Sequence, residues 1–270
     1  MTGKKQRIVG GLLAATVAVY TLSRPPERRP WITIPAGRYT LGSSEASDGR
    51  PPCVRTTPGF RIQRTEVTVA QFVRYLNRAD PLPRYDSPQI VHRNGRYRAL
   101  ADRREPVSYV SHADARGYAE WMDGRRTGRV RLPTSDEWEI AARGGVPGIR
   151  YPWGWAPPDS FAQFDADGAA RVARHPPNTV GLYDMAGNVA EWCVPEAGQE
   201  DAAYAMGGSW AERDPDYVRV FQRTPFPLDY RDADVGFRLI EEKQAPADNL
   251  LSRAFRAPRP RADAGKPVRD

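Results

Sequence analysis

The distribution of hydrophobic positions divides the chain into three parts. Residues 8–22 form a run of 15 residues without a charge, and short apolar patterns separated by Gly, Pro, Asn and Asp fill residues 31–240. From residue 241 onward the chain is rich in Ala, Arg and Pro and shows little periodicity, which is typical of disorder. We therefore expect one domain over 31–240. It is preceded by an N-terminal signal anchor with a Pro/Arg linker over 1–30 and followed by a mostly disordered tail over 241–270.

Three helices are predicted by a capping residue followed by helical periodicity. They start after Thr68, Ser111 and Thr134, and the third ends at Gly144-Gly145. In the first and third, Gln or Glu stands three residues after the cap, which is the pattern of a capping box.

Short strands account for the remaining periodicity. Residues 31–42 predict two strands around a Pro-Ala-Gly turn, and residues 60–65 alternate like a strand. Beyond Gly145 we expect no helix, only strand-like pieces at 217–221 and 236–240. The predicted fold class is α+β with much irregular backbone. Such backbone must bond to side chains, waters or ions, which gives a physical reason to look for a cation site.

The net charge of +7 does not describe the predicted domain. Residues 1–30 and 241–270 carry the whole excess, because residues 31–240 hold 27 Arg against 27 acidic residues and no Lys. A neutral domain argues against binding to nucleic acid. Aromatic residues make up 10% of the chain, too many for a disordered protein, and two cysteines cannot form a disulfide scaffold or a four-cysteine zinc site. Three isolated histidines (His92, His112 and His175) are read as ordinary surface or packing residues.

The first thirty residues resemble an export signal. Lys4, Lys5 and Arg7 precede the apolar run 8–22, and no clear cleavage site follows it. A helix of this length spans about 22 Å, short of a hydrocarbon core of roughly 30 Å, so it would have to thin the bilayer. We favour an uncleaved single-pass membrane anchor with an extracytoplasmic (periplasmic) domain. The alternatives are a cleaved signal that releases the domain to the periplasm and a buried helix.

A series of motifs between residues 31 and 240 resembles the sulfatase-modifying-factor domain, the fold of the formylglycine-generating enzyme. The motifs that carry the resemblance occur in order: Ile34-Pro-Ala-Gly37, Thr65-Glu-Val-Thr68, Pro106-Val-Ser-Tyr109, Arg131-Leu-Pro-Thr134, Tyr151-Pro-Trp-Gly154, Asn178-Thr-Val-Gly-Leu-Tyr-Asp-Met-Ala-Gly-Asn-Val-Ala-Glu-Trp192, Gly207-Gly-Ser-Trp210 and Val235-Gly-Phe-Arg238. The resemblance implies a C-type-lectin-like variant fold, rich in loops, with a shallow surface cleft.

Several side chains in these motifs have a structural interpretation. We expect the rings of Trp138, Trp153, Trp192 and Trp210 to be buried, with an N–H that needs a partner. Glu137 and Glu139 are expected to hold backbone groups or arginines.

The resemblance also implies one calcium loop. In that pattern the carbonyls of Ala186, Gly187 and Val189 join the Glu191 carboxylate on the ion, which suits the irregular oxygen coordination of calcium. The alternative is an ion pair between Glu191 and an arginine, with Asn188 capping the turn.

The resemblance fails at the oxidase site. The family's oxidases hold Cu(I) with two cysteines shortly after the Gly-Gly-Ser motif, because soft thiolates suit Cu(I). Here those positions are Glu212 and Tyr217, so copper is not expected. The candidate residues of the cleft are Ser209, Trp210, Glu212, Arg213, Asp216 and Tyr217. They could hold a harder cation or act as acid and base, or they could form a solvated acidic turn. Cys53 and Cys193 lie in other motifs, as a disulfide or as two free thiols.

These observations predict a membrane-anchored, non-oxidase member that binds a protein, peptide or glycan ligand through the cleft. The alternative is a cysteine-independent periplasmic tailoring enzyme or oxidoreductase of the same family. A genuine formylglycine-generating enzyme is the least favoured reading.

Overall fold

The fold is described by a computed structural model that covers residues 30–45, 50–80 and 83–242. The predicted anchor over 8–22 and nearly all of the predicted tail lie outside the described residues. Within the described ranges, no helix combines the length and the apolar character needed to cross a membrane.

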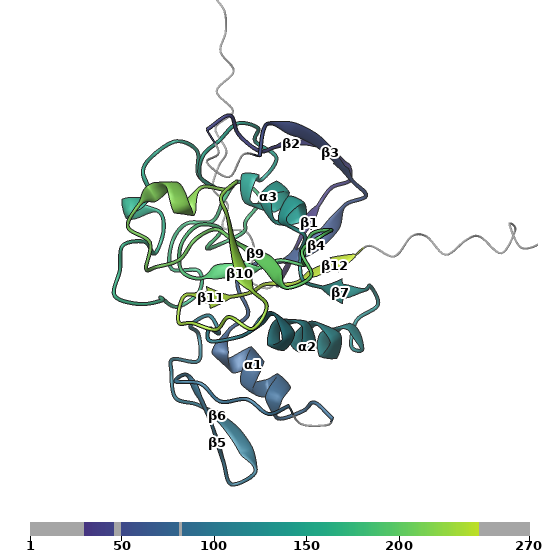
Figure 1. Cartoon of the computed structure of the whole chain (residues 1–270), viewed down its shortest axis with the longest axis vertical. Helices are drawn as coiled ribbons and strands as arrows, with labels where there is room; N and C mark the ends of the chain where they lie inside the picture. Colours follow the sequence, from purple (N-terminus) through teal and green to yellow (C-terminus); the bar gives the residue numbers. More distant parts are fainter. Residues whose placement is uncertain (1–29, 46–49, 81–82, 243–270) are drawn as a thin grey trace, which may run out of the picture.

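The first and last parts of the domain meet in a four-stranded antiparallel sheet. Its strand order is β1 (Trp31–Ile34), β4 (Phe60–Gln63), β12 (Ile240–Glu242) and β7 (Val130–Arg131). Figure 1 shows the purple and yellow strands side by side at this sheet. The sheet therefore places β12, the last strand of the described residues, next to β4 from the first part of the domain.

A second four-stranded sheet is formed by the later part of the chain. Its order is β10 (Arg223–Pro227), β9 (Ala202–Met206), β8 (Ala190–Trp192) and β11 (Val235–Gly236), and β11 runs parallel to β8. β10 contains two prolines and lies at the edge of the sheet, where a missing N–H is tolerated.

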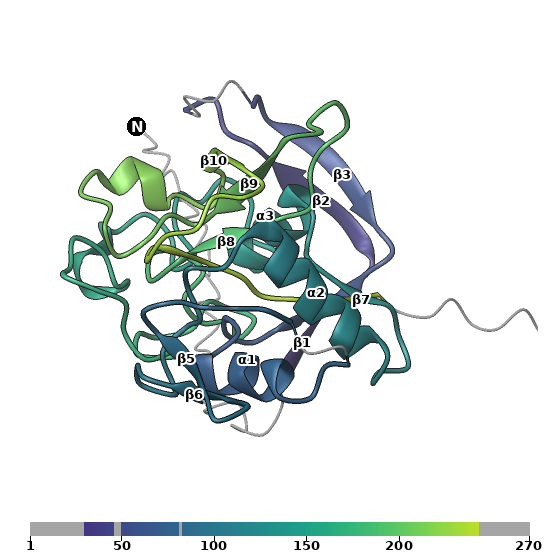
Figure 2. The same cartoon turned by 60° about the horizontal axis from the view of Figure 1, so that its bottom comes forward.

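Two hairpins project from this framework. β2 (Gly37–Leu41) pairs with β3 (Cys53–Thr57), and β5 (Ile90–Arg93) pairs with β6 (Arg96–Ala99). The β5–β6 hairpin extends beyond α1 at the bottom of Figure 1 and comes forward in Figure 2.

The three predicted helices are confirmed, with their caps. They are α1 (Val69–Leu76), α2 (His112–Asp123) and α3 (Ser135–Arg143), and each has a complete capping box. Gly144 ends α3 in the left-handed region at φ 57°, which glycine adopts without the steric cost of a Cβ. After residue 145 the described chain has only two short 3₁₀ helices, η1 (Pro158–Ser160) and η2 (Pro215–Val218).

The core of the described chain has two principal clusters of buried hydrophobic residues. One joins α1 and α2 with Trp31, Trp192 and Phe237, and the other joins α3, through Trp138, with Phe60 and Phe221. The long segments between these clusters carry the residues discussed below.

The two strands predicted around the Pro-Ala-Gly turn are confirmed as β1 and β2, which pair with β4 and β3 and not with each other. Two other strand predictions need correction. Residues 217–221 are not a strand, since the Asp214 side chain caps η2 there. Residues 236–240 are split between β11 and β12, because the Gln63 side chain takes the N–H of Leu239 at 2.8 Å.

The side-chain interpretations of Trp and Glu hold in large part. Trp138 and Trp192 are fully buried, while Trp153 and Trp210 are half-buried, and all four N–H groups have hydrogen-bond acceptors. Glu137 binds Arg131 through both oxygens, and Glu139 accepts from the N–H of Gly42 and from Arg143.

Candidate functional site

A double-glycine turn begins the segment in which the cleft was predicted. Gly207 and Gly208 follow β9 with φ of 89° and 62°. A Cβ on Gly208 would lie 2.6 Å from the carbonyl oxygen of Tyr217, and one on Gly207 would lie 2.9 Å from the Trp138 ring. Only glycine fits two such close approaches with left-handed backbone, so the turn is fixed by its sequence.

Ser209 is removed from the predicted cleft. Its side chain is fully buried, and its Oγ accepts from the N–H of Ala211 at 3.2 Å. The hydroxyl therefore stabilises the turn and is not offered to a ligand.

Trp210 and Glu212 connect three loops. The Trp210 Nε1 donates to the carbonyl of Ala233 at 3.2 Å, and its own carbonyl accepts from the N–H of Ala166 at 2.9 Å. The carbonyl of Glu212 accepts from the N–H of Asp165 at 3.0 Å. These hydrogen bonds hold the backbone of the Trp210–Glu212 segment against the loop before β11.

An acidic surface forms where Glu212 meets that loop. We use this name for Glu212, Tyr230, Asp232 and Asp234. Burial raises the pKa of Glu212, and the negative charges of Asp234 and Asp214 raise it further. Burial and the charge of Asp232 raise the pKa of Asp234, whose Oδ1 is buried without a hydrogen-bond partner in the described chain.

Tyr230 contributes an aromatic wall to the acidic surface. Its ring stacks on Phe226 at 4.4 Å between centroids, and its hydroxyl lies 3.5 Å from Asp232 Oδ2. Burial, followed by the charges of Asp234 and Asp232, raises its pKa to about 12. Such a surface can accept hydrogen bonds from a cationic ligand, and a carboxyl with a raised pKa can also give or take a proton.

Tyr230, Asp232 and Asp234 were not among the predicted cleft residues. Their signal in the sequence is weak, consisting of Asp-x-Asp directly before the Val235-Gly-Phe-Arg238 motif. Chain order separates them from Glu212 by about twenty residues, and tertiary contacts such as the hydrogen bond from Trp210 to the carbonyl of Ala233 bring the two segments together.

The other predicted cleft residues turn in different directions. Asp216 forms an ion pair with Arg219, and Tyr217 lies on η2 with 44% of its surface exposed. Arg213 is highly exposed and reaches Asp165 only at 3.9 Å. Asp216 is therefore neutralised by its own turn, while Glu212 belongs to the acidic surface.

A polar network is buried in the core around Glu191 and Arg238. Arg238 binds Glu191 through two contacts of 2.6 Å, Nε to Oε2 and Nη2 to Oε1, and neither side chain is exposed. Trp138 Nε1 donates to the same Oε2 at 2.7 Å. Burial alone would lower the pKa of Arg238, but the Glu191 carboxylate outweighs it and raises that pKa.

Two more carboxyl groups extend the network. Asn188 donates to Glu66 at 2.8 Å and accepts from the N–H of Ala170, so its side chain links loops rather than capping its own turn. Asp184 accepts from the N–H of Ala173 at 2.7 Å. Burial raises the pKa of Glu66 well above its usual range, and the charge of Asp184 adds to this effect.

These contacts bear on the predicted calcium loop. Calcium needs six to eight oxygen ligands with enough negative charge to repay its dehydration. Of the predicted set, Ala186, Gly187 and Val189 offer only carbonyls, and the Glu191 carboxylate is already neutralised by Arg238. The set fits calcium poorly, and the geometry favours the ion-pair alternative. Among the described residues, no three His, Cys, Asp or Glu side chains are arranged to hold a metal ion.

The two cysteines are separate free thiols. Cys193 is fully buried next to Trp192, and burial raises its pKa well above the usual range. Cys53 is half-buried in β3 and packs against the α3 cluster. Neither lies on the Gly207–Tyr217 segment.

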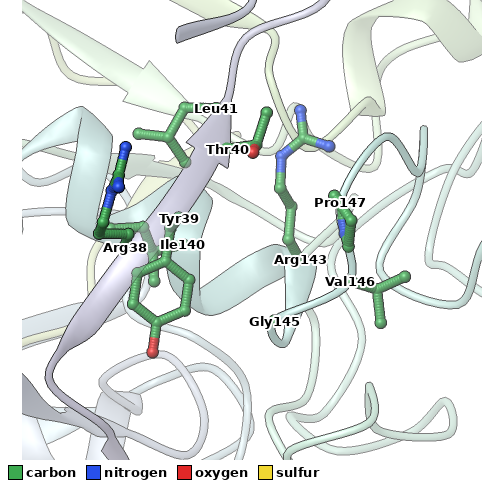
Figure 3. Close-up of a pocket in the computed structure, with 9 residues that line it drawn as sticks. All are labelled: Arg38, Tyr39, Thr40, Leu41, Ile140, Arg143, Gly145, Val146 and Pro147. Carbon is green, nitrogen blue, oxygen red and sulfur yellow. The ribbon is translucent and has the colours of Figure 1, made fainter. Parts of the chain in front are cut away.

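Three hollows in the described surface lie away from Glu212. The smallest, of about 150 Å³, is drawn in Figure 3, where Arg143 rises between Thr40 and Pro147. The guanidinium of Arg143 bonds Glu139 and the carbonyls of Gly42 and Ile149, so this hollow is structural. A groove of about 600 Å³ lies beside the start of α3, and another of about 460 Å³ lies beside residues 169–174.

Comparison with known proteins gives a consistent family. A model of the "Sulfatase-modifying factor enzyme 1-like domain" matches residues 20–243. The chain is 30% identical over 227 residues to the formylglycine-generating enzyme of Streptomyces coelicolor, covering 63% of this chain and 70% of that protein. It is 36% identical over 165 residues to the "Inactive C-alpha-formylglycine-generating enzyme 2" of Bos taurus, covering 54% of this chain and 53% of that protein.

A third relative is a much longer protein. The "Serine/threonine-protein kinase pkn1" of Chlamydia pneumoniae is 37% identical over 182 residues, 62% of this chain and 28% of the kinase. The chain thus spans between about a quarter and about half of the length of several curated relatives that it matches.

Solved structures agree with the fold. PvdO from Pseudomonas aeruginosa matches with a TM-score of 0.66 at 24% identity, covering 79% of this chain and 94% of that one. The Treponema denticola variable protein 1 matches with a TM-score of 0.62 at 21% identity, covering 79% and 95%. At these identities the likeness establishes the loop-rich α+β fold alone.

Proposed function

Because the chain belongs to the sulfatase-modifying factor enzyme 1-like family, yet has Glu212 and Tyr217 where its oxidases are expected to carry cysteines, we propose that it is a non-oxidase member that binds a peptide or protein ligand. The ligand would lie on the acidic surface of Glu212, Tyr230, Asp232 and Asp234. The domain would be held outside the cytoplasm by the segment 8–22.

One observation carries the non-oxidase part of this proposal. Thiolate chemistry with Cu(I) needs accessible thiolates in the cleft. The residue at the first expected cysteine position is Glu212, whose carboxyl interacts with Asp234, and the Cys193 thiol is fully buried with a raised pKa.

The chemistry of the acidic surface indicates the kind of ligand. Three carboxyl groups beside a stacked tyrosine suit the ammonium or guanidinium group of a basic side chain, which gains charge-assisted hydrogen bonds and ring contact. A basic peptide segment therefore fits better than a neutral glycan.

Co-expression tests the loss of oxidase activity. The chain and, in parallel, its Streptomyces coelicolor relative would be produced together with a sulfatase-derived cysteine peptide. Mass spectrometry should find formylglycine with the relative and unmodified cysteine with this chain. Formylglycine that depends on this chain would overturn the proposal.

Binding is tested with the full chain and fluorescent arginine-rich and glutamate-rich probe peptides. We expect anisotropy to rise with the arginine-rich peptide and the rise to be lost in Glu212→Gln/Asp234→Asn. The matched control Asp80→Asn/Asp159→Asn removes two exposed acids elsewhere and should bind like the wild type. Equal loss in both pairs would reduce the effect to net charge.

The membrane tether has its own test. A protein anchored through residues 8–22 stays with membranes after carbonate washing and is digested by protease added outside the inner membrane. Release by carbonate would remove the tether and leave the ligand proposal intact.

A second candidate function is a cysteine-independent tailoring enzyme. The specific observation in its favour is the raised pKa of both Glu212 and Asp234, since a carboxyl that keeps its proton above its usual pH range can act as a general acid. A metabolite lost from both a deletion strain and a Glu212→Gln strain would support this candidate over simple binding.

A further inference from the structure

The β5–β6 hairpin carries three arginines on one face. Arg93 lies directly opposite Arg96 in the antiparallel register, and Arg98 follows two residues further along β6. Opposed residues and residues two apart point to the same side of a sheet, so all three share a face, named here the arginine face. Ile90 and Tyr97 are buried on the other side, which packs against α1.

The fold does not neutralise the arginine face. Residues 90–99 contain no acidic residue, and Arg93, Arg96 and Arg98 are exposed and form no ion pair with any described residue. Like charges directly across a strand pair destabilise it. The hairpin thus keeps a local repulsion that an external anionic partner would relieve.

The hairpin holds these arginines in a fixed arrangement. Asn77, at the end of α1, exchanges two hydrogen bonds of 2.9 Å with the backbone of Tyr97, and the Tyr97 hydroxyl donates to the carbonyl of Pro83 at 2.6 Å. The strands extend outward from the domain, and Leu100 beside them is 60% exposed. A protruding, flat, cationic face with an apolar neighbour suits a flat surface better than a ligand that needs a groove.

The position of the predicted tether favours a membrane as that surface. Trp31, the second described residue, belongs to the same core cluster as the buried residues of α1 and Tyr97, which support the hairpin. Only residues 23–30 separate the apolar run from Trp31, and eight residues span at most about 29 Å. The domain would remain close enough for the arginine face to reach the headgroups.

We propose that the arginine face docks on anionic phospholipid headgroups of the membrane that holds the predicted anchor. This proposal rests on the tether in the proposed function and adds the orientation of the domain. Each arginine near an anionic surface strengthens attachment about fivefold, so neutralising three should weaken docking on the order of 100-fold.

The test uses the full chain reconstituted in vesicles. A fluorophore on Leu100→Cys in a Cys53→Ser background reports contact with quencher-labelled headgroups, while the buried Cys193 stays unlabelled. In phosphatidylglycerol vesicles we expect strong quenching that high salt reverses, and in phosphatidylcholine vesicles we expect little. Equal quenching in both lipids would overturn the proposal.

Matched variants separate docking from folding and from the anchor. Arg93→Gln/Arg96→Gln/Arg98→Gln should lose the quenching, whereas the Lys triple variant and the exposed control Arg38→Gln/Arg116→Gln/Arg213→Gln should keep it. The Gln variant should melt no lower than the wild type, because it removes the repulsion. Failure of the anchor is seen separately as carbonate release. Salt-sensitive binding to polyglutamate without any lipid contact would assign the face to a protein partner instead and overturn the proposal.

Discussion

Arg238 and Glu191 form a two-contact ion pair in which neither side chain is exposed to solvent. The Arg238 Nη2 also donates to the carbonyl of Tyr183 at 2.9 Å, and Trp138 donates to Glu191. The pair therefore joins the Gly-Asn-Val-Ala-Glu loop, the last motif of the domain and α3. In a fold with little regular structure, many backbone carbonyls have no partner strand. One guanidinium can donate hydrogen bonds to several of them.

Arg238→Met should be among the most damaging single substitutions. It leaves the Glu191 carboxylate buried and unpaired, and the expected loss in the free energy of unfolding is about 3–5 kcal/mol. Urea titration followed by tryptophan fluorescence measures this loss. Arg213→Met, at a highly exposed position, should show no change. The pair is specific if Glu191→Leu/Arg238→Met loses less than the two single variants added together, and additive losses would contradict it.

The neutralised state of Glu191 leads to a prediction about calcium. If Arg238 supplies the counter-charge, then EDTA and millimolar calcium should leave the melting temperature unchanged. Differential scanning calorimetry of the full chain in both conditions measures this. A rise with calcium that disappears in Glu191→Gln would instead support the calcium loop with the carbonyls of Ala186, Gly187 and Val189.

Local sequence signals were sufficient for the helices and for the family. Thr68, Ser111 and Thr134 each begin a helix as predicted, because a capping box is satisfied within four residues. The same holds for Gly144, where a single left-handed residue ends α3.

Contacts between distant segments were not predictable in this way. The strand prediction at 217–221 failed because the Asp214 cap outweighs the β-propensity of Tyr217 to Phe221. Of the four residues of the acidic surface only Glu212 was predicted, because the segments of Glu212 and Asp234 meet through tertiary contacts such as the hydrogen bond from Trp210 to the carbonyl of Ala233. The sequence also could not identify Arg238 as the partner of Glu191, because any of the 27 arginines in residues 31–240 could have formed that ion pair.

The acidic surface should reduce stability at neutral pH. The pKa of Glu212 is raised in the folded protein above its ordinary value of 4.5, so the folded state binds this proton more tightly than the unfolded state. The contribution of Glu212 to stability is therefore complete below pH 4.5 and is lost as the pH rises through the folded pKa. Glu212→Gln does not titrate, so it should be more stable than the wild type at neutral pH, and the difference should vanish below pH 4.5. Thermal melts across this range measure the difference in stability between Glu212→Gln and the wild type, and a constant difference at every pH would contradict the assignment.

Glu212→Gln should also bind the arginine-rich peptide less well than the wild type, so that stability is gained at the expense of binding.

The cysteines should differ in reactivity. Cys53 is half-buried, so a maleimide should modify it in the folded chain, while Cys193 should react only after unfolding, because it is fully buried and its pKa is raised. Mass spectrometry after timed labelling, without a reductant, counts the modified thiols. Two thiols are expected in denaturant, and none would show that the pair had formed a disulfide.

The double-glycine turn allows steric and conformational costs to be separated. Gly208 has a φ of 62°, and a Cβ there would lie 2.6 Å from the Tyr217 carbonyl oxygen, whereas Gly148 has a φ of 74° with no atom within 4 Å of its Cβ position. Alanine at either site pays for left-handed backbone, about 1–2 kcal/mol. Only Gly208→Ala must also displace the Tyr217 backbone, which raises its expected cost to roughly 2–5 kcal/mol. Urea titration of the two variants measures the difference. Because the same displacement moves η2 away from the Gly207–Glu212 segment, Gly208→Ala should also weaken binding of the arginine-rich peptide, which Gly148→Ala should leave unchanged. Equal losses of stability in the two variants would mean that the turn yields freely and does not fix the position of Glu212.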